Sequence, residues 1–386
     1  MLFYRRVVLD GTLAIALFIA MSGFLLAMPA ALNEGELPGG ARSFVIRRAR
    51  RLLPPYLVAY LGYLALYPLM AWLGQKTGFR PSEHFVRELA TFYTPSVVIS
   101  HLLLVFNLSA EWVGSSTGIL WTIPVEWHLY LVFALVLHPA SRRFGWGRTL
   151  LLVMLGTAAL HTAHVKGWLF YHQPWFAPIF VLGALAAHIS FSPLPRVCRL
   201  RELPWGWISF ALVLGTGAIL HWLGRDVPPD YIEPTVYGVA PAWRWIPDLA
   251  AGTAFSSVMV WLTRASTPGP DSGLVARGFL RFMGLRWLVC IERRSYSLYL
   301  THGAVIICLH HLIRPNAQLW IGDHVSILLR GLALCALATW LFYEGVERHF
   351  LPDSELAANG SRTTRDGKST LTRPPSIASA GLHHQG

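Results

Sequence analysis

The chain has 386 residues, of which 54% are hydrophobic and only 13% are charged, whereas roughly a quarter of the residues in a soluble domain carry a charge. This composition excludes an ordinary soluble domain and indicates a polytopic membrane protein. The formal net charge of +12 comes almost entirely from arginines in short segments between apolar runs, which is typical of topology signals rather than of a nucleic-acid surface. The cysteines have neither metal-ligand spacing nor a disulfide framework, and we expect no bound metal.

Apolar runs of roughly 20 residues are needed to cross a hydrocarbon core. We therefore predict an all-α, polytopic membrane helical bundle with about nine transmembrane helices. The segment 84–108 is first amphipathic and then apolar, so that both spanning and re-entry are open for it. We predict a membrane domain over residues 1–351 and a disordered tail over residues 352–386, because the tail is polar and lacks periodicity. The predicted spans are 12–32, 52–74, 119–139, 149–165, 173–190, 205–223, 245–263, 295–313 and 324–343.

The basic residues indicate which way the chain crosses the membrane. Arginines are concentrated in one alternating set of segments, which predicts that these segments and the tail are cytoplasmic. The span 12–32 would then run inward, although Arg5 and Arg6 favour a cytoplasmic N-terminus. A signal peptide cleaved near Ala27 is one explanation, but it would place the first arginine-rich segment outside. A helix missing upstream explains the conflict better. The arginine-rich segments are 42–51, 142–148, 196–201 and 264–294.

The run FVIRRARRLLPPY opens the second predicted span. Arg47 and Arg51 are one helical turn apart and would point the same way, and Pro54 and Pro55 suit the first turn of the following helix. Topology alone would account for these basic residues. The functional interpretation is a phosphate clamp at the inner face that includes Arg48, since guanidinium groups match phosphate oxygens in pairs.

The stretch WTIPVEWHLYLVF places Glu126 and His128 inside a predicted span, with Glu126 in its outer half. An ionisable residue there usually faces the bundle interior, and Pro124 would loosen the nearby backbone. A structural carboxylate paired with a basic group on a neighbouring helix is the simpler alternative to a catalytic one. Packing or interfacial anchoring is the simpler interpretation of Trp121 and Tyr130.

A third stretch, RRSYSLYLTHG, begins the eighth predicted span. Ser295 and Ser297 stand at a natural N-cap position, and His302 follows about two turns later in apolar surroundings. A histidine there can be a hydrogen-bonded structural residue or a general base. The sequence EGVERHFLP then closes the last span with charge, which we expect at the cytoplasmic face.

Taken in order, these stretches resemble the acyltransferase 3 family, integral membrane proteins that acylate hydroxyls on glycans and related molecules. The resemblance extends over roughly residues 9–352. It is most specific in the Trp–Val–Glu–Tyr pattern and in the SYSLYLTH element. The matching elements are Met21–Leu26, Phe44 to Pro54 with its arginines, His101 to Leu108, Leu120 to Tyr130, Gly183, Ser295 to His302, and Glu344 with Glu347 and Arg348.

The resemblance implies an acyl-CoA donor, typically acetyl-CoA, on the cytoplasmic side, and an acceptor hydroxyl on a cell-envelope saccharide or a similar small molecule. It implies that the arginines lie where the donor phosphates arrive and that the carboxylate lines the interior path. The residues concerned are Arg47, Arg48 and Arg51 for the donor; Glu126, His302 and His128 for catalysis; and Trp121, Tyr130, Ser295 and Tyr296 for substrate contacts.

The chain departs from the family pattern at its start. Members usually begin with a helix that ends in a histidine held to be the catalytic base. Here Leu9-Asp10-Gly11 leads directly into what looks like the family's second helix, and His84 is the first histidine. Three explanations are open: a true start further upstream, loss of the helix with loss of activity, or substitution by another histidine.

We therefore predict a multi-pass O-acyltransferase of the bacterial inner (plasma) membrane, surrounded by membrane lipids and with no nucleic-acid partner. The sequence leaves its oligomeric state open. One rival is a transporter in which Glu126 and His302 relay protons, but no internal repeat supports it. A catalytically inactive acyltransferase-like protein is the other rival.

Overall fold

The structure is a computed structural model that describes residues 11–77, 93–109, 112, 120–165, 173–223, 245–266, 273–312 and 321–351. All regular structure in these residues is helical, which confirms the all-α prediction. The predicted tail 352–386 lies outside the described residues. In chain order the helices are α2 (Gly11–Leu32), α3 (Gly40–Thr77), α5 (Pro95–Leu102), η1 (Phe106–Leu108), α7 (Thr122–Val132), the π-helical turn η2 (Phe133–Leu137), α8 (His138–Phe144), α9 (Trp146–Val165), α10 (Phe176–Phe191), α11 (Pro195–Arg201), α12 (Trp205–Leu223), α13 (Trp245–Ser266), α14 (Leu274–Met283), α15 (Arg286–Arg293), α16 (Ser295–Leu312), α17 (Ile321–Gly345) and η3 (Glu347–Phe350).

Within the described part of the chain, five helical segments are long and apolar enough to cross a membrane. The pair α10 and α11, bent by 102°, adds a sixth if it is one span. Helices α9, α13 and α16 also form where spans were predicted, but they carry more polar residues. The total of nine spans stays a prediction. The five segments are Leu13–Leu32, Gly40–Met70, Thr122–Phe144, Trp205–Trp222 and Leu328–Phe350.

The second span begins earlier than the sequence indicated. Helix α3 starts at Gly40, so the arginine run is helical, and Pro54 and Pro55 lie inside the helix instead of at its first turn. Prolines remove backbone donors, but a helix inside a bundle tolerates them when neighbouring groups satisfy the carbonyls. The Tyr296 hydroxyl donates to the Leu52 carbonyl oxygen at 2.8 Å and so ties α16 to this part of α3.

The segment after α3 does not span as one helix in its described part. Helix α5 has eight residues, about 12 Å of length, which is far less than a hydrocarbon core. It packs back against α3 through His101, whose ring stacks between Tyr60 at 4.9 Å and Phe106 at 3.9 Å. The Tyr56 hydroxyl also donates to the His101 carbonyl oxygen at 3.1 Å. These contacts hold α5 against α3.

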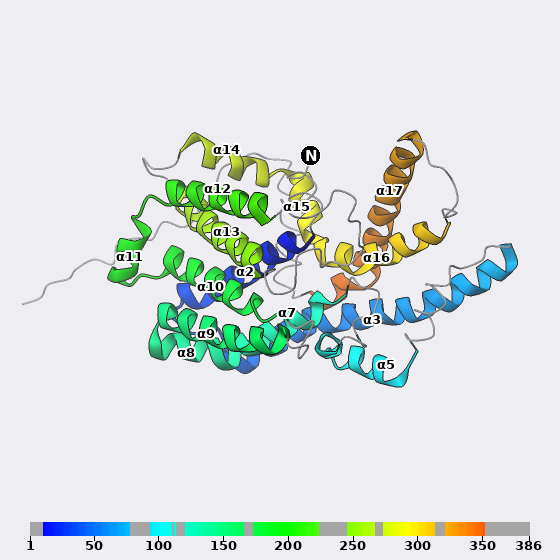
Figure 1. Cartoon of the computed structure of the whole chain (residues 1–386), viewed down its shortest axis with the longest axis horizontal. Coiled ribbons are helices and arrows are strands. Elements are labelled where there is room, and N and C mark those ends of the chain that lie inside the picture. Colours follow the sequence, from blue (N-terminus) through cyan, green and yellow to red (C-terminus); the bar gives the residue numbers. More distant parts are fainter. Residues whose placement is uncertain are drawn as a thin grey trace, which may run out of the picture.

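Helices α2, α10 and α13 form one half of the bundle, while α3 extends from it toward α5, α16 and α17 (Figure 1). Helices α2 and α10 cross at Gly23 and Gly183. A Cβ atom on Gly23 would lie 2.0 Å from the Phe180 carbonyl oxygen, and one on Gly183 would lie 1.9 Å from that of Ala20. Small residues let membrane helices approach this closely. Two of the recognised sequence elements therefore meet at one backbone contact.

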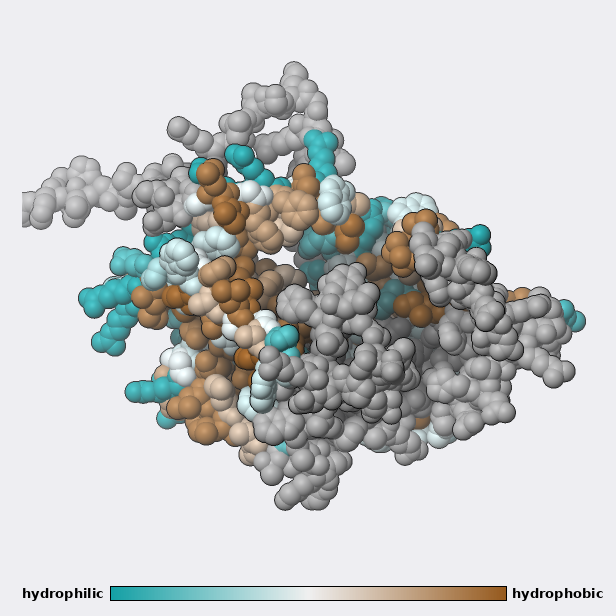
Figure 2. Space-filling view, turned by 45° about the horizontal axis from the view of Figure 1, so that its top comes forward, coloured by the Kyte–Doolittle hydropathy of each residue, from teal (hydrophilic) through white to brown (hydrophobic). Residues whose placement is uncertain are grey.

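The surface of the bundle carries many large apolar side chains, including Leu61, Leu151, Trp207 and Leu328. Figure 2 shows brown apolar residues beside teal polar ones over the part of this face that is not grey. Such a surface is unsuited to water but suits lipid, where apolar side chains face outward.

Candidate active site

The centre of the candidate site is the carboxylate of Glu126 on α7. This side chain is buried, at 6% exposure, and the Tyr130 hydroxyl one turn later donates a hydrogen bond to its Oε1 atom. The positive charges of Arg51 and Arg48 on α3 act on the same carboxylate. A buried carboxylate needs such partners. Glu126 therefore faces the bundle interior, as the sequence predicted.

Two of the three predicted clamp arginines, Arg48 and Arg51, act electrostatically on this carboxylate. Arg48 and Arg51 are three residues apart on one face of α3, and the Arg48 guanidinium lies 5.8 Å from the centre of the Phe44 ring. Arg47 is exposed and donates hydrogen bonds to Ser43 and, at 2.9 Å, to the Pro38 carbonyl oxygen. Arg47 thus fastens the turn before α3 instead of joining the interior group.

Helix α16 brings two tyrosines to the same place. The hydroxyl of Tyr296 bonds to α3, and the charge on Glu126 acts on it. The hydroxyl of Tyr299 accepts a hydrogen bond of 2.5 Å from Thr122, one turn before Glu126, and it also lies within electrostatic reach of the carboxylate. Three helices far apart in sequence therefore surround Glu126. Tyr296 was predicted from the sequence as a substrate contact and Tyr299 was not, although both lie in the SYSLYL element.

The two candidate histidines take different positions. The Nδ1 atom of His302 lies within hydrogen-bond distance of two carbonyl oxygens, those of Leu298 at 3.0 Å and of Tyr299 at 2.8 Å. Carbonyl oxygens only accept, so this nitrogen carries the proton and Nε2 keeps its lone pair. The ring of His302 lies beside that of Tyr299, with 5.6 Å between centroids. A neutral imidazole in this tautomer can accept a proton at Nε2.

His128 does not share the face of Glu126. Two residues along a helix correspond to a rotation of about 200°, and His128 hydrogen-bonds to the backbone of Leu104 on the opposite side of α7. The body of α7 therefore separates Glu126 from His128.

Two predicted substrate contacts lie elsewhere. Trp121 is buried and stacks on Phe176 of α10, with 6.2 Å between ring centroids, so it packs in the core. Ser295 is exposed at the first residue of α16. Of the four predicted contact residues, Tyr130 and Tyr296 are the two near the carboxylate.

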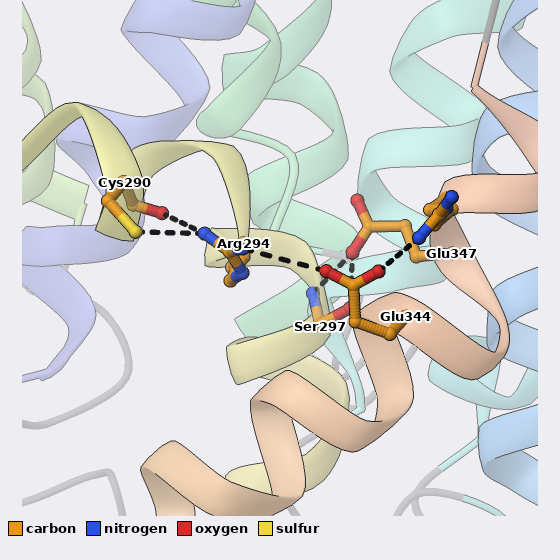
Figure 3. Close-up of polar contacts among 6 residues, drawn as sticks. Cys290, Arg294, Ser297, Glu344 and Glu347 are labelled. Atoms are coloured by element: carbon orange, nitrogen blue, oxygen red, sulfur yellow. Dashed lines mark hydrogen bonds and ion pairs between the residues drawn. The ribbon is translucent and has the colours of Figure 1, made fainter. Parts of the chain in front are cut away.

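A second buried carboxylate, Glu347 in η3, holds the start of α16. Its Oε2 atom accepts hydrogen bonds from the Ser297 backbone N–H at 3.0 Å and from the Ser297 hydroxyl (Figure 3). Both residues are almost fully buried. Helix α16 begins at Ser295, so Ser297 lies inside its first turn and not at the N-cap position that the sequence predicted. The bond partner of Ser297 comes from 50 residues away, which no local pattern indicates.

The other carboxylate of this segment, Glu344, lies nearer the surface. It pairs with Arg348 at 2.5 Å and with Arg294 at 3.7 Å (Figure 3). Arg294 also covers the Tyr343 ring at 4.8 Å and donates to the Cys290 sulfur at 2.8 Å. The end of α17 and the start of α16 are therefore joined by one buried carboxylate and one partly exposed ion-pair network.

The fold and this interior group define a membrane-embedded helical bundle with a buried carboxylate, two arginines and several tyrosines at its centre. A sequence model of the acyltransferase domain matches residues 2–343, and the chain therefore belongs to the acyltransferase 3 family. This membership supports a membrane acyltransferase in general. No curated protein and no solved structure matches the chain significantly.

Proposed function

We propose that the protein transfers an acyl group, an acetyl group in the simplest case, from acyl-CoA to a hydroxyl of a cell-envelope saccharide or a similar acceptor. The observation that carries this proposal is that Arg48 and Arg51, on one face of α3, act electrostatically on the buried carboxylate of Glu126. Guanidinium groups bind phosphate oxygens in pairs, so these arginines suit the phosphates of a CoA donor. The negative charge of Glu126 attracts both guanidinium groups.

In the proposed reaction, the acceptor oxygen attacks the thioester carbonyl carbon of the donor. A new C–O ester bond forms, the C–S bond breaks, and CoA leaves as the thiol after it takes up a proton. The acceptor proton passes to the Nε2 atom of His302, whose Nδ1 proton is held by backbone carbonyls. The hydroxyl of Tyr299, which accepts from Thr122 and so keeps its own proton, can donate to the negative oxygen of the intermediate.

We further propose that the arginine-rich segments face the cytoplasm at the inner membrane, and that the tail after residue 351 lies on the same side. Contacts bring some of these segments together at one end of the bundle. Arg142 pairs with Glu36, which lies shortly before the first arginine-rich segment, at 2.6 Å. Arg264 donates to the carbonyl oxygen of Arg201, in another of the segments, at 2.8 Å. The excess of arginine in these segments supports the orientation.

The test uses membranes that contain the full chain, radiolabelled acetyl-CoA, and release of CoA thiol as a second readout. We expect Arg51→Gln to raise the KM for the donor about tenfold, because a charge-assisted hydrogen bond to phosphate is worth roughly 1.5 kcal/mol or more. Arg50→Gln is the matched control, since Arg50 is the exposed neighbour on the same helix. Equal effects of the two variants would remove the arginines from donor binding.

The general base is tested by His302→Gln, with His128→Gln as its control. We expect His302→Gln to lower kcat by about 100-fold or more, whereas His128→Gln keeps most of the activity because its ring faces Leu104. A wild-type chain that is inserted in the membrane and releases no CoA would overturn the enzyme proposal and favour an inactive acyltransferase-like protein.

A further inference from the structure

The segment between α13 and α16 folds into two short amphipathic helices. Its arginines were predicted only to mark the topology of a connecting segment, but α14 covers Leu274–Met283 and α15 covers Arg286–Arg293. Together the two helices connect α13 to α16, and the proposed reaction uses no residue of either.

One face of this pair is apolar and exposed. Val275, Phe279 and Phe282 share a face of α14 because they are spaced four and three residues apart. All three are exposed, Val275 at 75%. Trp287 and Ile291, four residues apart on α15, are likewise exposed. The rings of Phe282 and Trp287 meet edge to face at 6.2 Å, which joins the two apolar faces into one surface.

The opposite side of the pair is basic. Arg277 and Arg281, one turn apart, are exposed on α14, and Arg286 and Arg293 lie at the two ends of α15. Glu292 is the single acidic residue between residues 274 and 293. A basic face beside an exposed aromatic and aliphatic face is the pattern of a helix that lies in a membrane interface.

Packing against the bundle fixes the position of this surface. Ala276 is fully buried and faces inward, and α14 packs against α13. The chain enters the pair from α13 and leaves it through α16. The apolar surface is therefore held at one end of a lipid-embedded bundle, where its neighbour is the headgroup region of that leaflet. Exposure of this much aromatic and aliphatic surface to water would be unfavourable.

We propose that the α14–α15 surface binds the anionic lipids of the leaflet at the arginine-rich end of the bundle. The apolar residues enter the boundary between headgroups and acyl chains, and Arg277 and Arg281 bind lipid phosphates. This binding is independent of the proposed transfer reaction and does not require it.

The experiment measures hydrogen exchange of residues 274–293 in the full-length protein in nanodiscs. One set of discs contains phosphatidylcholine alone, and the other contains phosphatidylcholine with 30% phosphatidylglycerol. We expect slower exchange of these amides in the anionic discs and loss of the difference in 0.5 M NaCl. An arginine near an anionic surface contributes roughly a fivefold factor in binding, so the variant Arg277→Gln/Arg281→Gln should lose most of the added protection.

The matched control is Arg196→Gln/Arg199→Gln, which removes two exposed arginines from α11. We expect this control to keep the full difference between the two discs. Equal exchange in both lipid mixtures, or equal loss in the control, would overturn the proposal. Protection that appears only when a disc holds two protein molecules would also overturn it and would point to contact with a second copy.

Discussion

The buried carboxylate of Glu347 gives the sharpest test of how α16 is held. The Glu347→Gln substitution keeps the shape and one acceptor oxygen, but it removes the negative charge that faces the first turn of α16. Charge-assisted hydrogen bonds contribute about twice as much as neutral ones, and a negative charge at a helix N-terminus adds roughly 0.3–1 kcal/mol. The hydrogen bonds that the hydroxyl and the backbone N–H of Ser297 donate to this side chain both become weaker. We expect a loss of about 2 kcal/mol in the free energy of unfolding, from the two hydrogen bonds and the helix charge together.

The assay follows thermal unfolding in detergent by the loss of the monodisperse elution peak. At the lower end of the usual scaling, 2 kcal/mol corresponds to a fall in Tm of roughly 4 °C. Glu344→Gln is the matched control three residues away, because its carboxylate is about a third exposed and a surface ion pair contributes about 1 kcal/mol or less. A double-mutant cycle with Ser297→Ala isolates the contact itself. Equal shifts for Glu344→Gln and Glu347→Gln, or a coupling energy below about 0.5 kcal/mol, would refute the reasoning.

Two further predictions concern packing and acid stability. Gly23→Ala and Gly183→Ala should each abolish the monodisperse elution peak or lower the free energy of unfolding by about 3 kcal/mol, because their methyl groups would overlap backbone atoms across the helix crossing. The control Gly156→Ala, with nothing within 4 Å of its Cβ position, should leave the peak and the Tm unchanged. Normal folding of both crossing variants would contradict the close approach of the two helices. Burial of its imidazole lowers the pKa of His101 from 6.5 to about 4. The unfolded chain therefore binds this proton at a higher pH than the folded one, and about 2 kcal/mol of stability should be lost between pH 7 and pH 5. The His101→Phe variant, which keeps the ring stacking, should show a flatter fall of Tm over this pH range, and an unchanged slope would exclude His101 as the cause.

The class of the protein and most of its helices followed from the sequence. Long apolar runs fold as helices in lipid because the backbone must satisfy its own hydrogen bonds, so eight of the nine predicted runs have a helix close to their predicted ends. The exception is the span predicted at 52–74, whose helix begins at Gly40. Its two prolines suggest a helix start, but both lie inside the helix, which a helix packed within a bundle tolerates. The apolar residues of segment 274–293 recur at the three- and four-residue spacing of a helix, but its arginines were interpreted only as topology signals.

The candidate site was predictable in its residue types and not in its geometry. The sequence alone determined that Glu126 is an ionisable group within an apolar helix and that such a group faces inward. It also showed which residues share a helical face, because that depends only on the period of one helix. Only the tertiary structure decided that Arg48 and Arg51 act on Glu126 while Arg47 bonds to the turn before α3. It also decided that His128 faces Leu104 and that a glutamate near the end of the last helix holds α16. These outcomes depend on the rotation and depth of each helix relative to its neighbours. Contacts between helices, such as the Gly23–Gly183 crossing, fix that rotation and depth, and no local sequence pattern contains this information.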